Sequence, residues 1–135
     1  MQLGFTIKWR GTNRPTNFVE KILGSQKIHT LRADKKNRWK PGNTIQFATG
    51  TRTIYYNQFH SGTCKATQAV ALMLVEGMLL IEVDRRILAD SERLAFIKND
   101  GFDSEQAFNE WFIPLISENG GVYNCKLIHW TDFKY

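Results

Sequence analysis

Residues 63–83 have the sequence TCKATQAVALMLVEGMLLIEV, in which two apolar, β-forming runs are separated by Glu76-Gly77. We predict strands over Thr63–Val75 and Met78–Val83, because Glu76-Gly77 is a break between two β-forming runs. Three similar runs lie elsewhere in the chain, at Thr44–Ala48, Arg52–Phe59 and Val122–Trp130. This succession of short strands and turns favours a small, mostly antiparallel barrel over a parallel sheet.

Further elements are predicted on both sides of these strands. A strand is expected over Leu3–Trp9, and apolar residues at helical spacing predict helices over Pro15–Gly24, Ser91–Lys98 and Ser104–Ile116. No repeat, low-complexity tract or linker interrupts the chain. We therefore predict one α+β domain over residues 1–135, a small, mostly antiparallel β-barrel with flanking helices.

The composition is that of an ordinary globular protein. Hydrophobic residues make up 42%, charged residues 23% and aromatic residues 13%, which excludes disorder over most of the chain and provides the bulk for a core. Cys64 and Cys125 form no CxxC pair, so we expect reduced thiols. The start of the chain has no apparent signal peptide, and the longest apolar run, Ala69–Val75, is far shorter than the ~20 residues of a membrane-spanning helix. We expect a cytoplasmic protein that does not associate with membranes.

Basic residues are concentrated early in the chain. Residues 1–40 hold ten Lys or Arg and two acidic residues, whereas residues 41–135 hold eight Lys or Arg and eleven acidic residues. A cationic region on a mildly acidic body favours an anionic partner such as RNA or a nucleotide. A solvated charge cluster without a ligand is the alternative. No feature implies an obligate protein partner.

The densest group of chemically active side chains lies at residues 24–32, GSQKIHTLR. Lys27 and Thr30 are three residues apart and share one side if the segment is bent. An ammonium beside a hydroxyl can grip a phosphate or a base, and a desolvated lysine can deprotonate a threonine for nucleophilic attack. A surface lysine beside a strand threonine, neither with a special role, is the third interpretation.

A tryptophan lies within the basic run that follows. Trp39 is flanked by Lys35, Lys36, Arg38 and Lys40. Its indole can stack on a base while the cations hold phosphates, or it can anchor the loop to the core. The sequence leaves both alternatives open.

A turn is predicted before the last helix. The Asn-Asp-Gly sequence at residues 99–101 is a strong turn signal, Phe102 fits a hydrophobic staple, and Asp103 or Ser104 is placed to cap the helix. Only Asp100 has no structural explanation here. Its carboxylate is either solvated at the tip of the turn or directed into a neighbouring cleft.

The chain lacks the sequence motifs of several classes of cofactor-binding protein and enzyme. The chain contains no P-loop, no GxGxxG and no GxSxG, which argues against nucleotide hydrolysis, Rossmann cofactors and serine-hydrolase chemistry. His29 and His129 have no third ligand at a recognised spacing. We therefore predict no metal site and no cofactor.

Taken together, these motifs resemble the ASCH domain family, a branch of the PUA-like β-barrel proteins. The features that match, in chain order, are Gly24-x-x-Lys27-x-x-Thr30-x-Arg32, Trp39-x-Pro41-Gly42 before a strand, Asp100-Gly101-Phe102 and Ile128-His129-Trp130. The resemblance covers nearly the whole chain. It implies a PUA-like barrel with a cleft, lined partly by residues 24–32, that binds RNA or a nucleoside-like or nucleotide-like ligand. The candidate ligand-binding residues are Gly24, Lys27, His29, Thr30, Arg32, Lys35, Lys36, Arg38, Trp39 and Lys40.

Some members that look like this chain are metal-independent amidohydrolases that remove the acetyl group from N4-acetylcytidine. Their catalytic lysine, threonine and carboxylate correspond by motif to Lys27, Thr30 and Asp100. Those enzymes have glutamate at the third position, and they are more compact around residues 52–59 and 107–121. In the enzymatic hypothesis Lys27 deprotonates Thr30, which attacks the acetyl carbonyl. Binding and catalysis both remain open at this stage, and the charge asymmetry favours binding.

Overall fold

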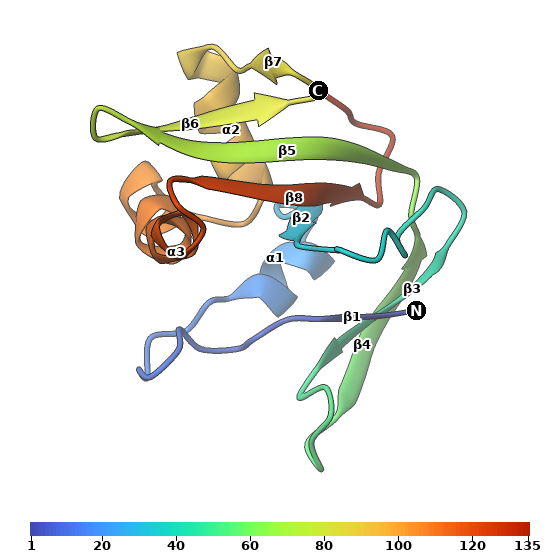
Figure 1. Ribbon diagram of the computed structural model, residues 1–135. Helices are drawn as coiled ribbons and strands as arrows, with labels where there is room; N and C mark the ends of the chain where they lie inside the picture. The colour runs from blue at the N-terminus through green and yellow to red at the C-terminus, as the bar shows by residue number, and fades with distance from the viewer.

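The computed structural model describes residues 1–135 and contains eight strands and three helices (Figure 1). In chain order these are β1 (Gln2–Gly4), α1 (Phe18–Leu23), β2 (His29–Arg32), β3 (Thr44–Thr49), β4 (Asn57–Thr63), β5 (Ala66–Val75), β6 (Met78–Val83), β7 (Arg86–Ile87), α2 (Asp90–Asn99), α3 (Glu105–Glu118) and β8 (Val122–His129). One sheet has the strand order β1-β3-β4 and the other β2-β8-β5-β6-β7. Only the β1–β3 ladder is parallel. The fold is therefore α+β with mostly antiparallel sheets.

The two strands predicted on either side of Glu76-Gly77 are confirmed, and they form a hairpin. β6 has the expected bounds, and β5 begins at Ala66, three residues later than expected. The two strands pair from Val70 opposite Val83 to Val75 opposite Met78. The connecting Glu76 and Gly77 have φ values of 50° and 80°, as a two-residue hairpin turn with positive φ at both positions requires.

The loop between β3 and β4 is longer than the sequence predicts. The strand expected over Arg52–Phe59 begins only at Asn57. Within residues 50–56, here called the β3–β4 loop, Thr53 N donates to Gly50 O and Tyr56 N donates to Thr53 O. These local turns occupy backbone groups that a longer ladder would use, so the loop extends beyond the sheet (Figure 1).

The helices follow the predicted order with small shifts at their ends. α1 is shorter than the predicted 15–24 range, whereas α2 and α3 lie within two residues of theirs. Ser104, and not Asp103, caps α3, because its Oγ accepts from Ala107 N at 3.1 Å. α3 packs on β5 and β8, and α2 packs on α3 (Figure 1). None of the three helices is long and apolar enough to cross a membrane.

The two sheets meet at their edge strands without closing into a barrel. β1 and β2 each lie at the end of a sheet, and no ladder joins them. The Arg32 side chain spans the gap, with Nη2 donating to Gly4 O. The structure therefore shows the mostly antiparallel α+β fold but no closed barrel, and a cavity lies where these two edges meet.

Candidate ligand-binding site

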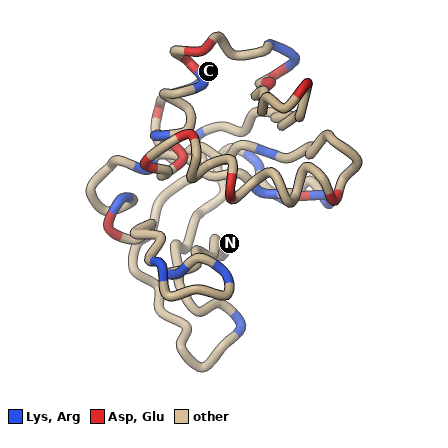
Figure 2. The backbone as a smooth tube through the Cα atoms, turned by 90° about the vertical axis from the view of Figure 1, so that its left-hand side faces the viewer, with Lys and Arg blue, Asp and Glu red and all other residues tan.

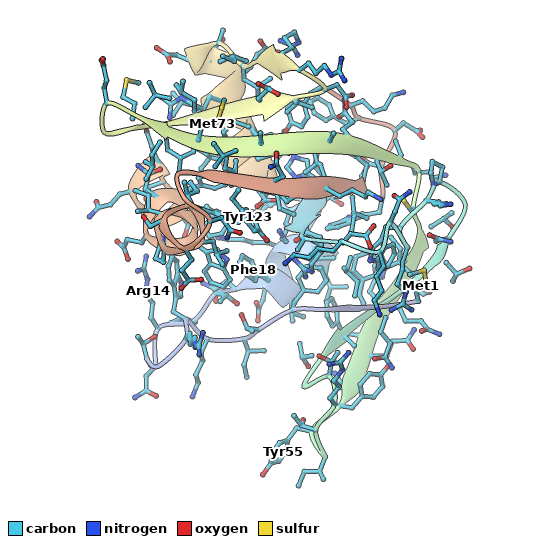
Figure 3. All side chains as sticks on the ribbon, viewed as in Figure 1. Met1, Arg14, Phe18, Tyr55, Met73 and Tyr123 are labelled. Carbon is cyan, nitrogen blue, oxygen red and sulfur yellow. The ribbon has the colours of Figure 1, made fainter.

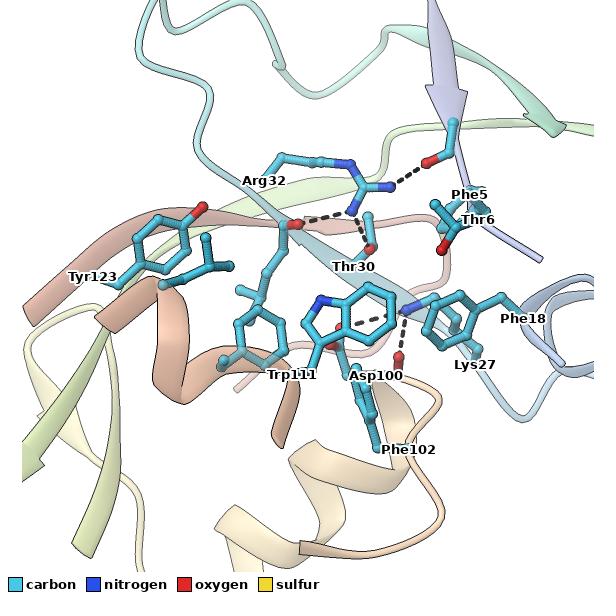
Figure 4. A pocket seen from close by; sticks show the side chains of 14 residues that line it. Phe5, Thr6, Phe18, Lys27, Thr30, Arg32, Asp100, Phe102, Trp111 and Tyr123 are labelled. Carbon is cyan, nitrogen blue, oxygen red and sulfur yellow. Dashed lines mark hydrogen bonds and ion pairs between the residues drawn. The ribbon is translucent and has the colours of Figure 1, made fainter. Parts of the chain in front are cut away.

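A cavity of about 200 Å³ lies between β1, β2 and α3 (Figure 4). Its polar lining consists mainly of Lys27, Thr30, Arg32 and Asp100. The first three come from the segment around β2, and Asp100 directly follows α2. The fold thus brings the lysine, threonine and carboxylate of the predicted catalytic set to one cavity. The aromatic lining consists of Phe5, Phe18, Phe102, Trp111, Phe112 and Tyr123.

The Lys27 ammonium is buried at the base of this cavity. Its side chain is 2% exposed, and Nζ donates to His29 O at 2.9 Å and to the backbone carbonyl of Asp100. Nζ also lies 3.7 Å from Asp100 Oδ1 and 4.9 Å from the centroid of the Phe18 ring. Burial lowers the pKa of Lys27 from 10.5 to about 8, although the Asp100 carboxylate opposes the shift. Lys27 is therefore present both as the ammonium and as the neutral amine near physiological pH.

Gly101 makes room for the buried lysine. Its φ is +97°, and a Cβ at this position would lie 2.8 Å from Lys27 Cδ and 3.2 Å from Phe18 Cδ1. Both the backbone conformation and the close approach therefore require glycine. The Asn-Asp-Gly turn predicted from the sequence thus positions the lysine as well as turning the chain.

Asp100 is buried and not solvated at the tip of its turn. The residue is 1% exposed and lines the cavity. Its Oδ1 lies 3.0 Å from His29 Nδ1. The sequence left open whether this carboxylate is solvated or directed into a cleft. In the structure it is directed into the cleft.

His29 holds Asp100 from behind and does not line the cavity itself. Asn99 Nδ2 donates to Tyr135 Oη at 3.1 Å, and that oxygen lies 2.7 Å from His29 Nε2. All of these contacts are satisfied when Tyr135 donates to Nε2 and the Nδ1–H of His29 donates to Asp100. Burial lowers the pKa of His29, although its hydrogen bond with Asp100 opposes the shift, so the neutral imidazole that this arrangement requires is favoured.

Arg32 connects the polar residues to β1 and retains free donors. Nη1 donates to Thr30 Oγ1 and to Leu31 O, each at 2.8 Å, and Nη2 donates to Gly4 O. These contacts use three of the five guanidinium N–H groups. The two that are left, at Nε and Nη2, can donate to a carbonyl or phosphate oxygen of a ligand.

The basic run after β2 is separate from the cavity. Its cations Lys35, Lys36, Arg38 and Lys40 are exposed on the loop before β3. Trp39 is 7% exposed and packs in the core, so it anchors the loop and offers little surface for stacking. Gly24 also lies away from the cavity, where it ends α1 with its N–H donating to Glu20 O.

Sequence reasoning missed the aromatic lining. Phe18 and Trp111 have the spacing of ordinary core residues on α1 and α3, and Phe102 was interpreted as a helix staple. They line the cavity because β1, α1 and α3 lie close together there. No local sequence pattern predicts that these three elements are neighbours. The high aromatic content was the only available signal.

The histidines do not form a metal centre. No group of three or more His, Cys, Asp or Glu side chains has the arrangement of a metal site. The rings of His29 and His129 lie 5.4 Å apart, on paired residues of β2 and β8. His129 Nε2 contacts Gln68 Oε1 at 2.9 Å, so this imidazole is held within the protein.

Comparison with known proteins does not assign a family. No family model, curated protein or solved structure matches the chain. The resemblance to the ASCH family therefore stays a prediction.

Proposed function

We propose that this protein binds a nucleoside-like ligand, either free or as one nucleotide of RNA, with the base in the cavity between β1 and β2. The observation that carries the proposal is a cavity with aromatic walls and with charged side chains at its bottom. Trp111 is only partly buried and offers its ring to a ligand, and Phe18 lines the same cavity with its ring 4.9 Å from the Lys27 ammonium. The Asp100 carboxylate lies 3.7 Å from that ammonium. Proteins recognise unstacked bases by this combination of aromatic contact and hydrogen bonding to the base edge.

The size of the cavity supports a small planar ligand. Its volume of about 200 Å³ is below the ~300–1,000 Å³ of typical drug-sized pockets. The free N–H groups of Arg32 suit a carbonyl or phosphate oxygen, and Asp100 suits an amino group. A single base with such groups fits this pattern better than a folded RNA does.

Membership of the ASCH family is part of the proposal. It is supported by the order of the motifs along the chain and by a cavity lined with Lys27, Thr30 and Arg32 of the family-like segment. In this interpretation the two sheets correspond to a PUA-like barrel that is open between β1 and β2. The Arg32–Gly4 hydrogen bond then takes the place of a ladder.

Titration with nucleosides by isothermal calorimetry tests the binding proposal. Lys27→Met keeps the length of the side chain and removes its donors, so we expect at least about a tenfold loss of affinity. The matched control is Lys98→Met, which changes an exposed lysine on α2. Unchanged affinity in Lys27→Met, or no nucleoside binding by the wild type, contradicts the proposal.

Hydrolysis of an N-acetylated nucleoside is the second candidate function. It is favoured by the position of Lys27, Thr30 and Asp100 around one cavity and by the lowered pKa of Lys27; Figure 4 shows Lys27 and Thr30 on the same cavity. Neutral Lys27 takes the hydroxyl proton while Thr30 Oγ attacks the acetyl carbon. The carbon–nitrogen bond then breaks, and the Lys27 ammonium returns the proton to the leaving amine. Water hydrolyses the Thr30 ester and releases acetate.

Release of cytidine from N4-acetylcytidine, followed by chromatography, tests this second candidate. We expect Thr30→Ala to abolish turnover and Thr30→Ser to retain part of it. Because the neutral lysine is the base, kcat/KM should rise ~tenfold per pH unit at low pH and level off above the Lys27 pKa of about 8. Full activity in Thr30→Ala, or a rate that falls as pH rises towards 8, contradicts the mechanism.

A further inference from the structure

The sheet formed by β1, β3 and β4, together with the β3–β4 loop, contains no acidic residues. No Asp or Glu occurs in residues 1–19 or 35–75, which include these three strands and the β3–β4 loop. Figure 2 shows this lower end of the molecule with Lys and Arg only. Lys8 and Arg52 are exposed there, and neither forms an ion pair within the protein. A surface on which cations outnumber carboxylates attracts a polyanion.

The β3–β4 loop also exposes large apolar side chains. Ile54 is 92% exposed, Tyr55 78% and Tyr56 40%. Figure 3 shows Tyr55 at the far end of this loop, directed away from the body of the protein. Exposed aromatic rings beside cations are the usual elements of a surface for single-stranded nucleic acid, because bases stack on the rings while the cations hold phosphates.

This loop lies directly beside the cavity. A Cβ on Gly4 would lie 2.8 Å from Thr51 Oγ1, so the loop packs against the β1 backbone. The carbonyl of the same glycine accepts the hydrogen bond from Arg32 that borders the cavity. One residue of β1 thus separates the loop from the proposed base site.

Two further hollows extend from Gly4. One, of about 580 Å³, is lined by Arg38 from the β2–β3 loop and Arg52 from the β3–β4 loop, and also by Asp34, whose carboxylate pairs with Lys126. The other, of about 570 Å³, is lined by Lys8 and Tyr55. Gly4 lines both hollows and the cavity, so a chain that leaves the cavity across Gly4 meets cations and an aromatic ring.

We propose that this surface binds single-stranded nucleic acid that continues out of the cavity, with phosphates at Arg38 and Arg52 and a flanking base on Tyr55. The inference deepens the proposed function and rests on it for the base in the cavity. Single strands fit because their bases are free to stack, whereas a duplex presents mainly phosphates and groove edges. The ligand is therefore a polynucleotide rather than a free nucleoside.

Fluorescence anisotropy with a single-stranded RNA of about ten nucleotides, within the ~4–16 nucleotides of common single-strand sites, tests the inference. We expect Arg52→Glu and Tyr55→Ala each to weaken binding about tenfold. Tyr55→Phe keeps the ring and should bind as the wild type does. Arg85→Glu is the matched control, because Arg85 is exposed on the β6–β7 turn and has no ion pair. Arg52→Glu should also reduce the salt slope by ~0.7.

The outcomes separate this inference from the proposed function. If nucleosides bind but RNA binds no more tightly, or if Arg52→Glu and Tyr55→Ala bind RNA as the wild type does, the nucleic-acid surface is wrong and the cavity proposal stands. Equal affinity for duplex RNA also overturns it. If RNA binding depends on Arg52 and Tyr55 while no nucleoside binds, the surface stands and the base site in the cavity is wrong.

Discussion

Gly101 controls the position of the buried lysine, and its replacement should affect both stability and binding. Gly101→Ala places a side chain at φ +97° and against Lys27. We expect a loss of ~1–2 kcal/mol in the free energy of unfolding from the backbone conformation alone, and a further loss of nucleoside affinity as Lys27 moves. Urea unfolding and calorimetric titration measure the two effects.

Gly120→Ala is the matched control for this prediction. Gly120 also has a positive φ, +75°, but a Cβ there has open space around it. The control should therefore lose stability and retain ligand affinity. Equal affinities in the two variants would show that Gly101 does not position the lysine.

At the scale of single residues, chemistry was easier to predict from the sequence than burial. Lys27 and Thr30 stand out because an ammonium and a hydroxyl occur three residues apart. Local patterns leave Asp100 either solvated or in the cleft, because its position depends on packing between α2 and the segment before β2. Only the resemblance to the ASCH family groups it with Lys27 and Thr30. It left two alternatives for Trp39, and the structure confirms the core anchor.

Among the elements, the loop between β2 and β3 depends on one carboxylate. Asp34 accepts hydrogen bonds from Arg38 N at 2.9 Å and Trp39 N at 3.0 Å, and Lys126 Nζ of β8 lies 2.8 Å away. Burial raises the pKa of Asp34, but these hydrogen bonds outweigh it and lower the pKa overall. The ionised carboxylate thus ties the basic loop to the sheet.

Asp34→Ala should therefore destabilise the protein. We expect a loss of ~2–3 kcal/mol in the free energy of unfolding, because two backbone donors lose their acceptor and Lys126 loses its charged partner, keeping only its bonds to Asn37 and the Trp39 carbonyl. Asp132→Ala removes an exposed carboxylate and should change stability by less than ~0.5 kcal/mol. Urea unfolding compares the two, and equal stability would contradict the role of Asp34.

The elements that the sequence predicted well have local signals. The β5–β6 hairpin has two apolar runs and a Glu-Gly turn, and α3 has a serine cap before an apolar face. β2 was missed because its four residues become a strand only through pairing with β8. The start of β4 was misplaced because turns in the β3–β4 loop take up residues that have strand-like composition.

For the whole molecule, the two buried histidines predict acid sensitivity. Burial lowers the pKa of His129 from 6.5 to about 4, and it lowers the pKa of His29 as well. The unfolded chain therefore takes up protons below pH 6.5 that the folded protein does not, so stability falls as the pH drops from about 6.5 towards 4. At pH 5, His129 alone should reduce the free energy of unfolding by up to ~2 kcal/mol relative to pH 7.

Urea unfolding at the two pH values, with NMR of the histidine rings, checks this prediction. The ring of His129 should remain neutral at pH 5 in the folded protein. Equal stability at pH 7 and pH 5 would contradict the assignment.

The position of the cavity explains why the whole site was not predictable from sequence. Its walls come from the facing edges of two sheets, β1 and β2, and from α3. Local patterns predict most of these elements but do not report which edges meet. The proposed function depends on the contact between these two edges, because it places the aromatic side chains of the cavity beside Lys27 and Asp100.

The most direct test is an NMR titration of the labelled protein with cytidine and N4-acetylcytidine. If the base enters the cavity, the backbone amides of Thr30 and Asp100 and the indole N–H of Trp111 should shift with one common affinity. The indole signals of Trp39 and the amides of the β6–β7 turn should stay unchanged. Shifts confined to residues outside the cavity, or no shifts with either nucleoside, would contradict the proposed site.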